Sequence, residues 1–294
     1  MGAGSWSTSS FRDYSTSKGY TISYSTSTVG KVDFNGMNAT QIYTSTSVDK
    51  MLNPYKVMRE CRESDEHPNT RPLILTLDVT GSMSDCLVEV ASSLNDIIAR
   101  LLESKDKLGD LEICVMGIGD LIYDDGAIQI GQFESDIRIA EQLDKIWFER
   151  GGGGNLYESY TVAWYMGARH TDLDCWKRGE KGIIITLGDE MINPYLPMRQ
   201  LSQMTGDSLQ GDIETEDLYI EASQKYDLYH IFVDHNNYIH KRCEGDAKSF
   251  KDVIGENNVF IATVNEISDV IVDIVSNNAN KTSAVSNDVN VITW

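Results

Sequence analysis

The sequence predicts an α/β fold: a doubly wound, mostly parallel sheet with helices on both faces. Apolar, β-branched runs such as 73–77 and 182–187 are typical of strands that are buried on both faces. These runs alternate with segments of helical periodicity, a pattern that produces parallel strands joined by right-handed crossovers. A Tyr-Asp-Asp-Gly turn at 123–126 joins two β-rich runs and so adds one antiparallel edge strand. A chain of 294 residues is long enough to bury such a core.

The first 46 residues differ in composition from the rest of the chain. Ser, Thr, Tyr and Gly dominate residues 1–46 and charges are few, which is typical of a flexible polar arm. Two stretches of this arm, 20–29 and 41–44, are rich in β-formers, so strands are an alternative there. We therefore expect a Ser/Thr/Tyr-rich N-terminal arm in front of the folded core.

Residues 47–72 lead from the arm into the core. They are expected to contain a short helix over 47–62, interrupted or started at Pro54, and then a polar loop. The core domain is expected to span 73–277, with a polar tail over 278–294 and a Pro- and Met-containing insert at 194–211. Its expected elements are, in chain order, strand 73–78, helix 86–102, strand 111–120, strand 127–133, helix 135–146, helix 156–168, strand 182–187, helix 214–226, strand 228–233, helix 247–254, strand 258–262 and helix 267–275.

The charge and the cysteine content argue against several classes of protein. The 45 acidic and 25 basic residues give a net charge of −20, so a nucleic-acid backbone is not expected as a partner. No apolar run approaches the roughly 18 residues of a membrane-spanning helix, and residues 1–6 do not resemble a signal peptide, so no membrane partner is expected. The five cysteines are widely spaced without a CxxC pair, which favours reduced thiols. We expect a soluble cytoplasmic protein.

The strand at 73–78 ends in a group of oxygen donors. Asp78 closes the apolar run, and Thr80 and Ser82 follow at alternate positions with Gly81 between them. A strand that turns through glycine into a helix presents these side chains at the carboxyl edge of the sheet, where ligands bind in open α/β folds. One carboxylate and two hydroxyls suit a hard divalent cation, Mg²⁺ first, with Mn²⁺ and Ca²⁺ as alternatives. A structural interpretation stands beside this one, because Asp78 and Ser82 are also good helix caps.

Two further loops are expected at the same edge of the sheet. Four glycines at 151–154 followed by Asn155 precede a helix, and a buried strand ends at Gly188-Asp189. The glycines permit a positive φ and a close approach of the backbone. Asn155 and Glu158 have the spacing of a capping box, so a structural role for this pair stays open.

These motifs together resemble a known family. An Asp-x-Thr-Gly-Ser-Met motif after a buried strand, a glycine-rich turn about seventy residues later and an apolar strand that ends in Gly-Asp resemble the von Willebrand factor A domain, of an intracellular bacterial or phage type. The resemblance covers roughly residues 71–277. It implies a metal-ion-dependent adhesion site, in which one coordination position is left for a carboxylate of a partner protein.

The resemblance also implies a role for each motif residue. Thr80 and Ser82 would bind the ion directly through their hydroxyls. Asp78 would bind it directly or through water, and Asp189 would be the distal aspartate, also often acting through water. Thr80 stands where the family more often has Ser, which keeps the hydroxyl.

The second loop departs from the family pattern. Where the family commonly has Thr just after the glycines, this chain has Asn155. Its amide oxygen is an acceptable ligand for a hard cation. Glu158 and Ser159, one helical turn further along, are alternates for the same role.

The expected function is that of a non-enzymatic, Mg²⁺-dependent protein-interaction module that binds an acidic residue of its partner, as an adaptor or assembly factor. A first alternative is a structural or assembly subunit, in a homo-oligomer or a larger assembly, that packs through residues 1–46. A second alternative is a Mg²⁺-dependent hydrolase, because Asp78 after a buried strand resembles the nucleophile of haloacid-dehalogenase-like phosphatases. Those enzymes need a second Asp two residues on, where Thr80 stands here.

Overall fold

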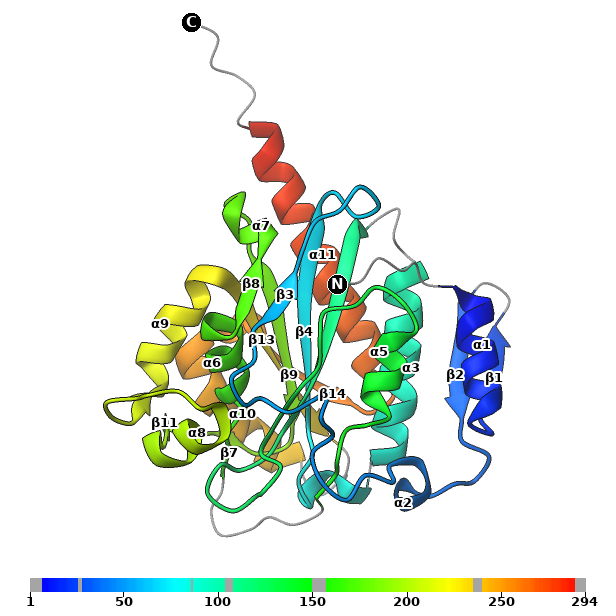
Figure 1. Cartoon of the computed structure of the whole chain (residues 1–294), viewed down its shortest axis with the longest axis horizontal. Helices are drawn as coiled ribbons and strands as arrows, with labels where there is room; N and C mark the ends of the chain where they lie inside the picture. Colours follow the sequence, from blue (N-terminus) through cyan, green and yellow to red (C-terminus); the bar gives the residue numbers. More distant parts are fainter. Residues whose placement is uncertain are drawn as a thin grey trace, which may run out of the picture.

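A six-stranded sheet forms the centre of the molecule, in the order β14-β13-β9-β4-β5-β6 (Figure 1). The computed structural model describes residues 7–25, 28–85, 87–103, 108–149, 157–234 and 240–288. The strands of the central sheet are β4 (Thr70–Asp78), β5 (Asp110–Ile118), β6 (Ile128–Ile130), β9 (Gly182–Gly188), β13 (Tyr226–Asp234) and β14 (Val259–Thr263).

The sheet is parallel except at one edge. Strands β4, β5, β9, β13 and β14 pair in parallel with their neighbours, and β6 pairs antiparallel with β5. The predicted fold class is therefore confirmed. The chain first builds the sheet outward from β4 through β5 to β6, and then returns to the other side of β4 to add β9, β13 and β14. The boundary between β4 and β9 is thus the point where the strand order reverses, and ligands bind at this point in doubly wound sheets.

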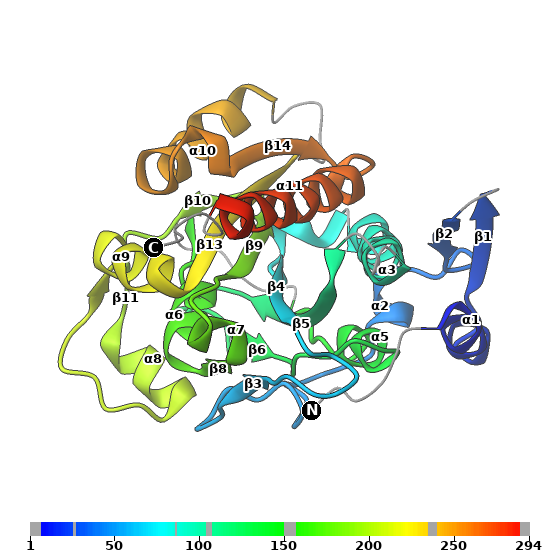
Figure 2. The ribbon, with the colours of Figure 1, turned by 90° about the horizontal axis from the view of Figure 1, so that it is seen from above.

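Helices cover both faces of the sheet, and side chains alternate between two apolar cores. In β4, Leu73 and Leu75 join the core beneath α3, α5 and α11, whereas Ile74 joins the core beneath α6, α9 and α10. Figure 2 shows the two layers on either side of the strands. The helices are α3 (Leu87–Glu103), α5 (Arg138–Leu143), α6 (Val162–Arg169), α7 (Asp174–Lys177), α8 (Met198–Thr205), α9 (Thr215–Lys225), α10 (His240–Ile254) and α11 (Ile267–Asp288), with short 3-10 turns at Ser82–Asp85 and Glu256–Asn258.

The N-terminal arm is folded against this body. It consists of α1 (Thr8–Ser17), a hairpin of β1 (Thr21–Ser25) and β2 (Thr28–Asp33), and α2 (Ala39–Ile42). The alternative of strands over 20–29 is thus confirmed, in β1 and the start of β2, whereas 41–44 is not a strand. Strand β2 packs on α3 (Figure 1). Phe11 and Phe34 are buried and belong to the same apolar core as the buried residues of that helix. The Tyr14 hydroxyl donates to Asp144 Oδ2 at 2.5 Å, which ties α1 to the end of α5.

The expected helix over 47–62 is wrong. The side chains of Asp49 and Asn53 accept hydrogen bonds from backbone N–H groups two residues further on, and such local turns compete with a helix. The stretch instead follows the outer edge of β6, where Ile130 N donates to the carbonyl of Leu52 at 2.8 Å. It ends in β3 (Arg59–Cys61), which pairs in parallel with β8 (Thr171–Leu173).

The expected polar tail over 278–294 is also wrong in its first part, because α11 runs to Asp288. Asn278 holds the helix beyond its predicted end by donating to Asp227 Oδ2 at 2.7 Å, and Ala279 is buried. A helix, α8, occupies part of the 194–211 insert, beside the short strands β11 (Tyr195–Leu196) and β12 (Ile213–Glu214). Among the described helices, none combines the length and the apolar character that spanning a bilayer requires.

Candidate metal centre

Asp78 is the last residue of β4 and its side chain is fully buried. Its Oδ1 accepts hydrogen bonds from the backbone N–H of Thr80 at 2.9 Å and from the Thr80 hydroxyl at 2.5 Å. An aspartate that binds its own backbone two residues on folds the chain into a tight turn. The sequence Asp-x-Thr therefore holds a carboxylate and a hydroxyl side by side at the carboxyl end of β4.

Ser82 connects this turn to a second strand. Its Oγ lies 3.1 Å from Thr80 Oγ1 and donates to Asp189 Oδ1 at 2.8 Å. Asp189 follows β9, the neighbour of β4 across the point where the strand order reverses. The structure thus brings four predicted residues, Asp78, Thr80, Ser82 and Asp189, into one cluster of oxygens at the predicted edge of the sheet. Each hydroxyl donates to a carboxylate, so the two hydroxyl oxygens face each other.

Tyr160, which the sequence did not single out, contacts this cluster of oxygens through Asp78. Its ring is fully buried, and its hydroxyl donates to Asp78 Oδ2 at 2.7 Å. The Tyr160 hydroxyl oxygen also accepts a hydrogen bond from Glu190 N at 3.2 Å. Tyr160 is therefore the hydrogen-bond partner of the second Asp78 oxygen, and it links Asp78 to the loop after β9. Gly188 makes room for the ring, because a Cβ at this position would overlap the tyrosine oxygen.

The second loop is described only in part. Asn155, the predicted ligand there, lies outside the described residues. Glu158, at the end of β7 (Tyr157–Glu158), is 7% exposed, and its Oε2 has no hydrogen-bond partner among the described residues. Ser159 Oγ accepts from the backbone N–H of Leu121 at 3.0 Å. Ser159 is therefore engaged in holding a neighbouring loop, whereas Glu158 keeps an unmatched oxygen.

The loop after β5 adds two further buried carboxylates, Asp120 and Asp124. Asp124 Oδ2 accepts from Asp120 N at 2.7 Å, and Asp120 Oδ1 accepts from Ile122 N at 2.6 Å. Sequence reasoning missed both, although Gly119-Asp120 repeats the strand-Gly-Asp pattern of Gly188-Asp189 and strand β5 is the other neighbour of β4. All three central strands thus end in acidic residues.

The electrostatics of this edge favour a cation. Burial, and then the negative charge of Asp189, raise the pKa of Asp78. Burial, and then the charge of Asp78, raise the pKa of Glu158, with Asp120 and Asp124 adding to the shift. None of the described neighbours that dominate either pKa is a cation. These carboxylates are therefore held at a free-energy cost that a bound cation would offset.

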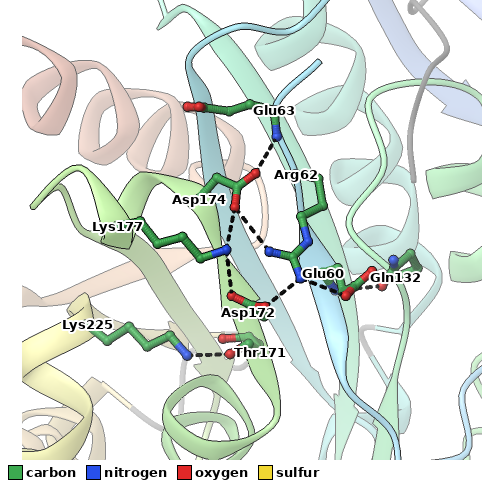
Figure 3. Close-up of polar contacts among 9 residues, drawn as sticks. All are labelled: Glu60, Arg62, Glu63, Gln132, Thr171, Asp172, Asp174, Lys177 and Lys225. Carbon is green, nitrogen blue, oxygen red and sulfur yellow. Dashed lines mark hydrogen bonds and ion pairs between the residues drawn. The ribbon is translucent and has the colours of Figure 1, made fainter.

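A second acidic cluster of the same protein shows the opposite arrangement (Figure 3). The guanidinium of Arg62 lies 2.8 Å from Glu60, 2.5 Å from Asp172 and 3.1 Å from Asp174. Lys177 lies 2.8 Å from Asp174, and hydrogen bonds from Lys177 and Arg62 lower the pKa of Asp174. Each of these carboxylates already has a basic partner, so the cluster joins β3 to β8 and α7 through ion pairs.

The donor set at the ends of β4 and β9 fits a hard cation. It consists of two carboxylates, Asp78 and Asp189, and two hydroxyls, Thr80 and Ser82, with the unmatched oxygen of Glu158 nearby. Within the described ranges, no three His, Cys, Asp or Glu side chains converge as a metal-binding group. Mg²⁺ commonly uses one or two protein carboxylates and keeps several waters. The site therefore suits Mg²⁺ better than a metal that needs a full cage of protein ligands.

Comparison with known proteins finds likeness only among solved structures, since no family model and no curated protein matches. The pilus adhesin SpaC from Lactobacillus rhamnosus GG has a TM-score of 0.49 at 10% identity, over 74% of this chain and 31% of the adhesin. Proximal thread matrix protein 1 from the mussel byssus has a TM-score of 0.47 at 11% identity, over 71% and 48%. The vWF domain of the type V pili tip protein Mfa5 from Porphyromonas gingivalis has a TM-score of 0.44 at 10% identity, over 76% and 98%.

This chain spans about a third of the adhesin and about half of the byssus protein. Such distant likenesses carry no information about a partner, so the chemistry of this protein has to be argued from its own residues. The fold class rests on the order and direction of its strands.

Proposed function

We propose that this protein is a divalent-cation-dependent protein-binding module that recognises a carboxylate of its partner. The observation that carries the proposal is the cluster of oxygens that Asp78, Thr80, Ser82 and Asp189 form at the point where the strand order reverses. Buried acidic groups without a dominant basic neighbour support a cation there. Oxygen donors alone favour Mg²⁺, with Mn²⁺ and Ca²⁺ as alternatives.

The ligands that we assign are Thr80, Ser82 and the carboxylates of Asp78 and Asp189. From the second loop we assign Glu158 rather than Ser159, because the Ser159 oxygen already accepts from Leu121 N and the Glu158 oxygen has no described partner. Glu158 would move toward Asp78 and Asp189 when the cation binds, since the three carboxylates do not converge in the described residues. A bound Mg²⁺ would supply an open coordination position for an acidic side chain of the partner. The protein would hold the ligand oxygens in place and would keep basic side chains from dominating their surroundings.

We also propose that the site performs no phosphoryl transfer. A phosphatase of the aspartyl-nucleophile type needs a general acid next to its nucleophile. The residue in that position is Thr80, whose hydroxyl donates to Asp78 Oδ1, and the other oxygen of Asp78 accepts from Tyr160. Both carboxylate oxygens are thus hydrogen-bonded and the group is fully buried, which favours binding over nucleophilic attack.

Assembly through the N-terminal arm is the second candidate. Much of the arm's apolar surface is already used inside the chain, since Phe11 and Phe34 are buried against the body. Lys18 also lies 3.2 Å from Asp144, beside the hydrogen bond from Tyr14. These contacts favour an arm that completes the fold of its own subunit.

Direct measurement of cation binding tests the main proposal. Titration of the full chain with Mn²⁺, followed by electron paramagnetic resonance, should show one site in the wild type, competition by Mg²⁺ and loss of binding in Asp78→Ala. Asp217→Asn, an exposed acid of the first turn of α9, is the control for lost charge. Capture of protein partners in Mg²⁺, with release by chelator and none by Asp78→Ala, would complete the test. Partner binding that survives both the chelator and Asp78→Ala would contradict it.

A further inference from the structure

A second concave site lies on the flank of the molecule, away from the sheet edge that carries Asp78. It is a cavity of about 540 Å³ between the turn around Lys56, the end of α6 and the loop after α8. Helix α6 begins at Val162, just after the Glu158 loop, and His170 caps its other end. The cavity is large enough for a small organic molecule. It has no role in the function proposed above.

His170 and Asp207 form the inner wall of this cavity and are hydrogen-bonded to each other. The buried ring of His170 has its Nδ1 2.9 Å from the carbonyl oxygen of Val57 and its Nε2 2.6 Å from Asp207 Oδ2. Both ring nitrogens of His170 therefore lie within hydrogen-bond distance of an acceptor. The Tyr165 hydroxyl donates to the same oxygen of Asp207. Asp207 Oδ2 is thus held in the inner wall by Tyr165 and His170.

The outer wall keeps unused hydrogen-bond donors. Arg169 gives its Nε and Nη2 to the two oxygens of Glu221, both at 2.8 Å, while its guanidinium lies 4.9 Å from the centre of the Tyr165 ring. A guanidinium carries five N–H groups, so this pairing leaves donors over. Lys56 is exposed and forms no ion pair with a described residue; its ammonium lies 5.4 Å from the Tyr55 ring centre. Lys56 and the remaining N–H groups of Arg169 are therefore the cationic donors that line the cavity.

The backbone holds Lys56 in an unusual conformation. Its φ is +54°, a value that only Asn35 shares among the described non-glycine residues. Its N–H donates to the Thr205 carbonyl at 2.7 Å, and Gly206, which ends α8, packs so closely that a Cβ there would lie 2.8 Å from Lys56 Cγ. A left-handed conformation is unfavourable for a residue with a Cβ such as lysine. Strain of this kind gathers at functional positions.

We propose that this cavity binds a small organic anion, a carboxylate or phosphate attached to an apolar body. Lys56 and the free donors of Arg169 would hold the anionic group, since charge-assisted bonds to a carboxylate or phosphate are the strongest that these side chains form. Val57, Met58 and Leu209 line the same cavity and provide the apolar wall. In a chain of net charge −20, the exposed Lys56 and the remaining donors of Arg169 give this cavity cationic groups that favour such a ligand.

Ligand-observed saturation-transfer NMR with the full chain tests the proposal with three probes: phenyl phosphate, benzoate and the neutral benzyl alcohol. The buffer is kept free of divalent metal, so that the edge at Asp78 cannot capture the anions. The wild type should bind both anions at least tenfold more tightly than benzyl alcohol, with affinity falling as salt is added. Equal binding of the alcohol, or no anion binding at millimolar concentration, would overturn the proposal.

Matched variants locate the binding. Lys56→Asn removes the charge but keeps a residue that tolerates positive φ, and it should weaken anion binding at least tenfold. Lys50→Asn removes a lysine of the same segment that does not line the cavity, and it should leave binding unchanged. Glu221→Gln, also outside the cavity, weakens the hold on Arg169 and should tighten binding. Equal affinities for Lys56→Asn and Lys50→Asn would contradict the assignment, as would weaker binding by Glu221→Gln.

Discussion

The hydroxyl of Tyr160 lies 2.7 Å from Asp78 Oδ2 and accepts a hydrogen bond from Glu190 N at 3.2 Å. This one oxygen joins the loop after β4 to the loop after β9, the two strands between which the strand order reverses. Two hydroxyls therefore fix the orientation of the Asp78 carboxylate: Tyr160 binds Oδ2 and Thr80 binds Oδ1. A ligand set that is held in place before the cation arrives loses less entropy on binding.

Removal of this hydroxyl should weaken cation binding. In Tyr160→Phe, Asp78 Oδ2 loses a donor in a buried site, which costs about 1–3 kcal/mol of stability. We expect a roughly tenfold loss of Mn²⁺ affinity, since the carboxylate is no longer oriented. Tyr226→Phe is the control, because that buried hydroxyl lies 2.8 Å from Thr171 Oγ1, away from the site. Equal Mn²⁺ affinities in the two variants would show that Tyr160 has only a structural role.

Gly188→Ala should displace Tyr160 without touching any assigned ligand. A Cβ at Gly188 would overlap the tyrosine oxygen, so the ring has to move away from Asp78. Overpacking of this kind costs typically 1–3 kcal/mol, and we expect a loss of at least about 2 kcal/mol in urea unfolding. The Mn²⁺ affinity should fall with it. Gly211→Ala, where a Cβ would meet no atom within 4 Å, should change neither quantity.

Asp78→Asn should have opposite effects with and without metal. The amide removes a buried charge whose pKa is raised by burial and by Asp189, so the metal-free variant should unfold at a higher temperature than the wild type. In the wild type, Mg²⁺ at a hundredfold excess over its Kd should add about 2.7 kcal/mol of stability. The variant should gain none of this. Calorimetry with chelator and with Mg²⁺ measures both differences, and a metal-dependent shift retained in Asp78→Asn would contradict the assignment.

Much of the fold could be predicted because its strands are apolar on both faces. The runs at 73–77 and 182–187 lie in β4 and β9 as expected, and the predicted hairpin forms from β5 and β6. Local polar groups account for the error over 47–62. Asp49 and Asn53 each bind a backbone N–H and so replace the helix with turns.

The candidate site could be predicted where its residues are close in sequence. Asp78, Thr80 and Ser82 are separated by single residues, and the parallel sheet brings Asp189 to them. Tyr160 stands 82 positions from Asp78, and no periodicity or motif marks a tyrosine that packs beneath a carboxylate. Long-range packing of this kind becomes visible only in three dimensions.

Substitutions at Glu158 and Ser159 test which residue of the second loop binds the cation. Glu158→Gln keeps the size of a buried side chain but removes the charge that we assign to the cation, so Mn²⁺ affinity should fall about tenfold or more. Ser159→Ala should cost about 1 kcal/mol of stability, because Leu121 N loses its acceptor, and should leave the affinity unchanged. Electron paramagnetic resonance and urea unfolding distinguish the two effects. The reverse result would place the ligand at Ser159.

The buried carboxyl of Glu112 in β5 should make stability depend on pH. Its side chain is 2% exposed, and burial raises its pKa from 4.5 to about 7, although a hydrogen bond with Cys61 acts in the opposite direction. Between these two values the folded protein holds a proton that the unfolded chain releases, so this carboxyl makes the free energy of unfolding fall as pH rises. The full difference corresponds to about 3 kcal/mol. Urea unfolding at pH 5 and pH 8 should show a smaller decrease for Glu112→Gln than for the wild type, because the amide does not titrate. Equal decreases in the two proteins would exclude Glu112 as a source of the pH dependence.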